Sequence, residues 1–297
     1  MITIVQSLVF PGLAYALVAA LFMAWLERKV LARVQRRIGP PFMQPFFDVV
    51  KLLGKRSIRR PAPQGFIMGV LPVASVIVTL AAATLLPVFR DGVKFTGDLV
   101  LFISLLEAGP LFSVLGGYAS RSLWGGLGAT REAVMTVCYN LTFLTAIVAL
   151  AWGGPLQLTS AAGAHWPVRV AAVIAVLMCL PAKLHLNPFS VAEAEQEIYA
   201  GTITEYDGWK LAFWHLAHGL EWVVLAGLVA VVVLPSPLAI GWWLVPAVMA
   251  VSVVVVLVLS SVAGATARLK LAQTARWFWL WGLLVAVVAF VLAVVGV

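Results

Sequence analysis

Charged residues are scarce in this chain: they make up 11% of its 297 residues, whereas 63% are hydrophobic. A soluble domain usually carries about 25% charged residues. So few charges cannot cover a soluble globule of this length, which excludes large soluble domains. Because a helix needs about 20 apolar residues to cross a bilayer, the sequence instead has material for many membrane spans.

Cysteine is nearly absent. Cys138 and Cys179 both lie in apolar stretches, without a neighbouring thiol or a His at ligand spacing. A disulfide framework, a zinc site and an iron–sulfur site are therefore not supported. The sequence also lacks a phosphate-binding Gly-rich loop and a Ser/His/Asp arrangement. We expect no catalytic residue, no metal and no cofactor bound by this chain.

Acidic residues are few as well, with 12 Asp and Glu against 20 Lys and Arg, which gives a net charge of +8. In a protein with many spans, such an excess usually reports topology and contact with anionic lipid. Nucleic acid is therefore not an expected partner.

Eight apolar runs are long enough to cross a bilayer: 3–26, 66–88, 98–118, 132–153, 167–186, 209–234, 238–262 and 276–296. The runs are continuously apolar and do not alternate, which predicts helices and excludes the strands of a barrel. No linker or repeat divides the chain. We therefore predict an all-α, polytopic membrane protein with about eight transmembrane helices, forming a single integral domain over residues 1–297.

The basic residues predict the orientation of these spans. All but three of the 20 Lys and Arg residues fall in or beside the first, third, fifth and seventh connections; the exceptions are Arg90, Lys94 and Arg169. By the positive-inside rule, the odd-numbered connections face the cytoplasm. Both termini are then expected on the outer side of the cell membrane. The two long cytoplasmic loops are 27–65 and 187–208, and helix-like apolar spacing at 46–53 predicts an amphipathic surface helix in the first.

The second cytoplasmic loop is acidic and supplies five candidate proton-relay residues: Glu193, Glu195, Glu197, Glu205 and Asp207. On a helix, Glu193 and Glu197 would share one face, because they are four residues apart. Crowded, poorly solvated carboxylates hold protons more tightly, as a relay requires. The alternative is a solvated acidic face that docks a basic partner.

Five further relay candidates lie within the predicted spans: Glu107, Glu132, His215, His218 and Glu221. Ionisable side chains in the bilayer normally line a polar path or pair with a neighbour. His215, His218 and Glu221 follow one another at intervals of three, so they form one helical stripe. The stripe is expected to act either as a proton wire or as interhelical hydrogen-bonding groups.

Lys183 and His185 lie at the cytoplasmic end of the fifth predicted span. They could counter the acidic residues that follow. For Lys183, the favoured interpretation is that the long side chain extends to the membrane interface.

Three passages go beyond composition: ERKVLARVQRRIGPPFMQPFFDVVKLLGK (27–55), LGGYASRSLWGGLGATREAVMTVCYNL (115–141) and AEAEQEIYAGTITEYDGWK (192–210). Together they resemble the subunit of respiratory complex I that joins its peripheral and membrane arms, and the homologous membrane subunit of energy-converting NiFe hydrogenases. The resemblance covers most of the chain.

Two features favour the hydrogenase branch. In complex I subunits the motif at 37–40 is normally followed by an insertion with another Gly-Pro, whereas here it runs almost directly into 43–45. The short total length and the ending ARLKLAQTARWFW (267–279) point the same way. One departure concerns the fourth span, where the family commonly places a carboxylate after a Tyr. Here Tyr139 is followed by Asn140, which cannot titrate and is left out of the relay.

The resemblance implies a membrane-anchor and proton-relay subunit of a ferredoxin-, formate- or carbon-monoxide-linked hydrogenase complex. Its partners would be the hydrogenase large and small subunits, an iron–sulfur subunit and antiporter-like membrane subunits. The nickel–iron centre and the iron–sulfur clusters would belong to those partners. The alternatives are the quinone-chamber subunit of complex I and a purely structural anchor. Five charged residues of loop 27–65 are expected to dock the peripheral arm: Arg33, Arg36, Arg37, Asp48 and Lys51.

Overall fold

The computed structural model describes residues 12–58, 61, 63–87, 97–161, 163–234 and 243–296, without the side chains of 159–160 and 195–196. Its long helices are α2 (Leu13–Val34), α4 (Gln64–Leu85), α5 (Asp98–Ala119), α6 (Leu123–Ala151), α8 (Trp166–Lys183), α10 (Gly208–Val233) and α11 (Leu244–Ala265). A last span combines α12 (Leu271–Trp277), the π-helical turn η4 (Phe278–Gly282) and α13 (Leu283–Val295). The short elements are α3 (Gln44–Gly54), α7 (Leu158–Ala161), α9 (Glu195–Ile198) and η1 (Gly201–Ile203).

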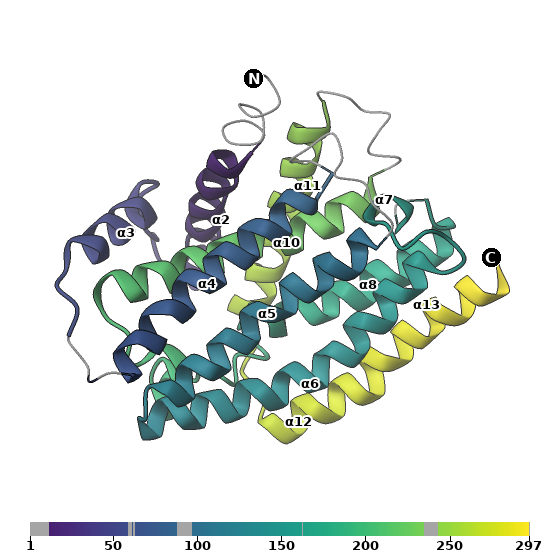
Figure 1. Ribbon diagram of the computed structural model, residues 1–297. Coiled ribbons are helices and arrows are strands. Elements are labelled where there is room, and N and C mark those ends of the chain that lie inside the picture. Colours follow the sequence, from purple (N-terminus) through teal and green to yellow (C-terminus); the bar gives the residue numbers. More distant parts are fainter. Residues whose placement is uncertain are drawn as a thin grey trace.

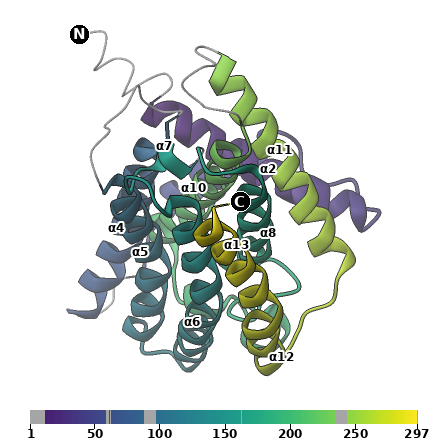
Figure 2. The ribbon, with the colours of Figure 1, turned by 90° about the vertical axis from the view of Figure 1, so that its right-hand side faces the viewer.

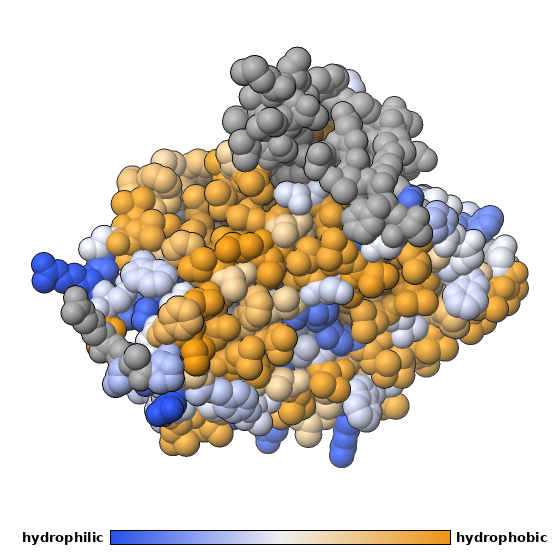
Figure 3. All heavy atoms as spheres, viewed as in Figure 1, coloured by the Kyte–Doolittle hydropathy of each residue, from blue (hydrophilic) through white to orange (hydrophobic). Residues whose placement is uncertain are grey.

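The predicted all-α membrane fold is confirmed. Within the described ranges there are no strands, and seven helices are long and apolar enough to cross a membrane. The eighth long helix, α2, carries four charged residues in its second half. Part of the first predicted span, residues 3–11, lies outside the described residues. Hydrophobic side chains cover most of the face shown in Figure 3, and hydrophilic ones gather mainly toward its edges.

Helix α10 occupies the centre of the bundle (Figures 1 and 2). It contacts α2, α3, α4, α8 and α11, and 78% of its most apolar stretch is buried. Gly219 allows α2 to approach closely, because a Cβ there would lie 3.0 Å from the carbonyl oxygen of Ala20 on α2. The span formed by α12, η4 and α13 lies on the outside, against α6 and α8.

Two predicted helix boundaries are wrong. Helix α2 continues eight residues past the expected end at 26, so Arg33 lies in its last turn and not in a loop. Helix α6 begins at Leu123, which places Glu132 within the helix, nine residues after its first residue. Hydropathy reports which segment can lie in lipid, whereas a helix can continue into water as long as its backbone hydrogen bonds are made.

The amphipathic helix predicted in the first long loop is α3. Asp48 fastens it to α2 and to itself, because its carboxylate accepts hydrogen bonds from Arg28 at 3.0 Å and from Gln44 at 2.8 Å. Its apolar side chains Phe46, Phe47, Val50 and Leu53 remain exposed. The helix therefore offers an uncovered hydrophobic face.

The basic connections meet at one end of the bundle. The loop after α3 contacts the loop before α10, where the backbone N–H of Ile58 donates to the Asp207 carboxylate at 2.6 Å. Glu197 accepts hydrogen bonds from Arg131 at 2.5 Å and from Arg268. The first, third, fifth and seventh connections therefore lie at the same end of the helix bundle, as the charge pattern predicts.

Arg169, an exception to that pattern, lies at the other end. Its guanidinium donates to the carbonyl oxygens of Val232, Val233 and Leu234 at 2.8, 3.0 and 3.1 Å. These carbonyls end helix α10 and lack partners within the helix. A cation is favoured there by the helix dipole as well. Arg169 therefore holds the end of the central helix.

The Glu197 contacts predict an acid-sensitive loop. The hydrogen bond from Arg131, with the positive charge of Arg268, holds the pKa of Glu197 below its ordinary value. A lowered pKa adds stability above about pH 4.3, the usual pKa of Glu, and this stability is lost as the pH falls through the folded-state pKa. Because the side chain is 48% exposed, its replacement is expected to cost no more than about 1 kcal/mol.

The measurement is chymotrypsin cleavage of loop 187–208, which carries the exposed Tyr199, in the assembled protein, for Glu197→Gln and the unchanged chain. Cleavage of the variant should be faster at pH 7 in low salt. High salt, which screens exposed ion pairs, should reduce the difference. Equal cleavage rates at pH 7 in low salt would show that the two arginines do not hold the loop.

Candidate functional site

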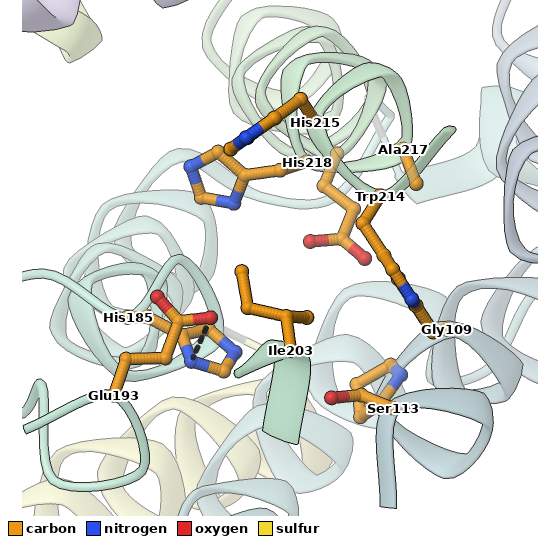
Figure 4. Close-up of a pocket in the computed structure, with 11 residues that line it drawn as sticks. Gly109, Ser113, His185, Glu193, Ile203, Trp214, His215, Ala217 and His218 are labelled. Atoms are coloured by element: carbon orange, nitrogen blue, oxygen red, sulfur yellow. Dashed lines mark ion pairs between the residues drawn. The ribbon is translucent and has the colours of Figure 1, made fainter. Parts of the chain in front are cut away.

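A polar cavity of about 120 Å³ lies at the end of the bundle where the basic connections meet. Helices α5 and α10, the loop after α8 and the turn η1 form its walls (Figure 4). The lining residues are Gly109, Pro110, Ser113, His185, Glu193, Ile203, Trp214, His215, Ala217, His218 and Glu221. Five of them are ionisable, although most of the chain is hydrophobic.

His185 links two carboxylates from different elements. Its Nε2 lies 3.6 Å from Oε1 of Glu132 on α6, and its Nδ1 lies 3.6 Å from Oε1 of Glu193 in the acidic loop. Figure 4 shows His185 beside Glu193 on one side of the cavity. Burial lowers the pKa of His185, but the charges of Glu132 and Glu193 outweigh it and raise the pKa above the ordinary value. The imidazole is therefore a proton-binding group between two acids.

This cluster has unused hydrogen-bonding capacity. Among the described residues, neither Oε1 of Glu132 nor Nδ1 of His185 has a hydrogen-bond partner, although both are buried. The indole N–H of Trp214, also on the cavity wall, lacks one too. Buried polar groups normally find partners or ordered water. A cavity of about 120 Å³ has room for roughly four waters at about 30 Å³ each.

The helical stripe of α10 lines the opposite wall. His215, His218 and Glu221 all line this cavity, as their spacing predicts. Figure 4 shows the two histidines together on this wall. Nε2 of His218 lies 3.7 Å from Oε2 of Glu27 on α2. The same oxygen accepts a hydrogen bond from the buried indole of Trp222 at 2.9 Å.

Glu27 and His185 are the two residues whose importance the sequence does not reveal. Glu27 directly follows the predicted first span and is expected to be a cytoplasmic loop residue. Its helix in fact continues, so the carboxylate stays against α10. For His185, the sequence predicts only a positive charge that counters the acidic residues after it. The available signal was its place in the short connection between Lys183 and the acidic loop.

Glu107 lies in a separate polar cluster. Its Oε1 is 2.5 Å from Nζ of Lys183 and its Oε2 accepts a hydrogen bond from Asn140 at 2.7 Å. The Lys183 side chain is 3% exposed. The expectation that it extends to the membrane interface is therefore wrong, because the partly buried carboxylate of Glu107 offers the ammonium a stronger interaction than water at the interface.

The other described acids of the loop do not line the cavity. Glu197 is clamped at the surface by two arginines, and Asp207 binds the backbone at Ile58. Glu205 is half-buried between η1 and α10 and is not among the residues that line the cavity. The side chain of Glu195 falls outside the described residues. Within the acidic loop, Glu193 is thus the described carboxylate that faces the histidines.

Four of the five predicted docking residues are exposed, and the fifth is bound within the chain. Arg33, Arg36 and Arg37 are exposed at and after the end of α2, and Lys51 is exposed on α3. Asp48 is engaged within the chain by Arg28 and Gln44.

The cavity suits proton exchange better than the binding of a larger molecule. Carboxylates and imidazoles from α10 and from the loop after α8 line it, and these groups can alternately accept and release protons. Small-molecule sites usually measure roughly 300–1,000 Å³, which is larger than this cavity.

Comparison with known proteins places the chain in a family. Residues 7–294 match the family described as NADH dehydrogenase. Formate hydrogenlyase subunit 4 of Escherichia coli is 30% identical over 92% of this chain and 95% of its own length. NADH-quinone oxidoreductase subunit 8 of Rhodothermus marinus is 30% identical over 77% of this chain and 71% of its own length.

The fold has a close counterpart among solved structures. A chain of the membrane-bound sulfane sulfur reductase, an archaeal respiratory membrane complex, superposes with a TM-score of 0.88 at 23% identity. The match covers 99% of this chain and all of the other. With its membrane-spanning helices and its match over nearly the whole sequence, this chain belongs to the NADH dehydrogenase family, which includes hydrogenase-linked and quinone-linked membrane subunits.

Proposed function

We propose that this chain is the membrane-anchor and proton-relay subunit of a membrane-bound, energy-converting NiFe hydrogenase complex. The observation that carries the proposal is the cavity, where Glu193 and His185 face the histidines and Glu221 of α10. His185 also contacts Glu132, which does not itself line the cavity. The similarity to formate hydrogenlyase subunit 4, which extends over nearly both complete chains, supports the hydrogenase assignment.

The proton route starts at Glu193, whose side chain is 36% exposed. His185 accepts a proton from Glu193 and passes it to Glu132, which is buried. Water in the cavity joins this branch to Glu221 and His218 on the other wall. From His218 the route reaches Glu27 on α2. Glu197 and Asp207 hold the loop that carries Glu193.

The redox chemistry belongs to partner subunits in this proposal. A nickel–iron centre and iron–sulfur clusters are carried by the hydrogenase large and small subunits and an iron–sulfur subunit. These dock at the cytoplasmic face, against Arg33, Arg36, Arg37 and Lys51. Antiporter-like membrane subunits adjoin the bundle in the cell membrane.

A second candidate is the quinone-chamber subunit of complex I. It is favoured by the 30% identity to NADH-quinone oxidoreductase subunit 8, although that match covers less of both chains than the hydrogenase-linked one. Purification of the complex separates the two. Nickel and hydrogen-dependent dye reduction indicate the hydrogenase, whereas NADH oxidation with quinone reduction indicates complex I.

The relay predicts a loss of coupling when its carboxyls cannot titrate. Glu132→Gln and Glu193→Gln keep the side-chain shape and should leave the complex assembled, with normal hydrogen-dependent dye reduction. Electron transfer that is coupled to a proton gradient should fall by roughly a hundredfold, the usual contribution of a proton-transfer group. Glu205→Gln is the matched control, because that residue lies in the same loop but does not line the cavity. Normal coupling in both relay variants would favour a purely structural anchor.

The exposed arginines predict the docking site of the peripheral arm. Charge reversal of Arg36 and Arg37 to Glu should release the redox subunits from purified membranes, because it replaces attraction to an acidic partner surface with repulsion. The measurement is the amount of nickel-containing subunit retained after washing. Lys55→Glu, just after α3, controls for the general effect of a new negative charge. Full retention in the double variant would indicate that this corner faces lipid.

The charge pattern also predicts the side of the membrane. Tags inserted near residues 56 and 200 should be protected in intact cells, and a tag near residue 160 should be labelled by an impermeant reagent. Labelling near 200 from outside would reverse the proposed orientation.

A further inference from the structure

Lys183 is a buried cation at the last residue of α8. Its ammonium lies 2.5 Å from Glu107 on α5 and over two aromatic rings of α6, at 4.8 Å from the centre of Tyr139 and 4.5 Å from that of Phe143. Three helices therefore enclose the charge. Aromatic rings attract a desolvated cation through their π-faces, so these two rings stabilise the Lys183 ammonium at this site.

Asn140 completes the surroundings of Glu107. Its amide Nδ2 donates to Oε2 at 2.7 Å, while Lys183 occupies Oε1. Each carboxylate oxygen thus has its own donor. Glu132, which lies beside His185, differs, since its Oε1 has no hydrogen-bond partner among the described residues.

This arrangement does not suit a proton carrier. Neither an ammonium nor an amide N–H accepts a proton, so neither of the described groups that bind the Glu107 carboxylate can take a proton from it. Protonation of Glu107 would also leave Lys183 as an unpaired buried charge, which is strongly unfavourable. The pair is stable only if the carboxylate stays ionised.

We propose that Lys183 is a tethered counter-ion that keeps Glu107 as a fixed carboxylate outside the proton path. Lys183 and Asn140 are then positioning residues, and the pair presents no net charge to the neighbouring cavity. The proposal rests on the proposed relay, from which it removes Glu107. It implies that neutralising both partners together is tolerated, while neutralising Lys183 alone is not.

The experiment compares Lys183→Met, Lys183→Arg, Glu107→Gln and the double variant Glu107→Gln with Lys183→Met in the purified complex. Infrared spectroscopy in H₂O and D₂O detects the carbonyl stretch of a protonated carboxyl. We expect Lys183→Met to gain one such band, because the unpaired Glu107 takes up a proton. The band should be missing in the double variant and in Lys183→Arg, which retains a cation.

Coupling gives the second readout. The double variant should keep gradient-coupled electron transfer at the level of the unchanged complex, whereas Glu132→Gln should lose it. Loss of coupling in an assembled double variant would overturn the proposal, since Glu107 would then be on the path. A protonated-carboxyl band in the unchanged complex that disappears in Glu107→Gln would overturn it as well.

The two proposals fail in different ways. If Glu132→Gln and Glu193→Gln also keep full coupling, the relay itself is refuted. The infrared bands still decide the role of Lys183 in that case, because they report the protonation of Glu107 without any turnover. If the double variant does not assemble, the unchanged complex, Glu107→Gln and Lys183→Arg provide this comparison.

Discussion

Charged side chains inside the helix bundle are poorly solvated, and the arrangement of the helices depends on how these charges are paired. An ion in a medium of low dielectric constant must find a partner or become neutral. The buried and partly buried ionisable groups accordingly occur in sets from different elements: Glu107 with Lys183, His185 with two carboxylates, and Glu27 with His218. Each set joins helices as well as charges, so the polar groups that make a proton route possible also define how α2, α5, α6, α8 and α10 assemble.

Most of the architecture was predictable because its causes are local. Apolar run length identifies the helices, basic residues identify the shared end, and spacing by three identifies the face of α10. The predictions that failed concern residues whose contact partners are distant in the sequence. Glu27 is 195 residues from Trp222, and Lys183 is 76 residues from Glu107. Nothing in either neighbourhood indicates which helix will supply the partner, so hydropathy alone assigned both residues to the membrane surface.

Small residues explain why the acidic loop can enter the bundle. A Cβ at Gly128 on α6 would lie 2.7 Å from backbone atoms of Gly201 and Thr202, and one at Gly117 on α5 would meet the backbone of Gly125. These close approaches seat η1 between α5 and α6, where Ser113 and Thr202 share a hydrogen bond of 2.9 Å. The Gly-rich passage therefore acts through packing, and its effect is to bring Glu193 over His185.

Helix α10 is fastened at both ends, by Asp207 to the loop after α3 and by Arg169 through its last carbonyl groups. A helix tied in this way cannot slide along its axis without breaking charged hydrogen bonds, each of which contributes about 1.5–3 kcal/mol. Helix α10 is thus fixed in position along its axis. In the proposed complex, energy from a redox partner would reach the membrane by redistribution of charge and water around this helix, since movement of the helix along its axis would first have to release both attachments.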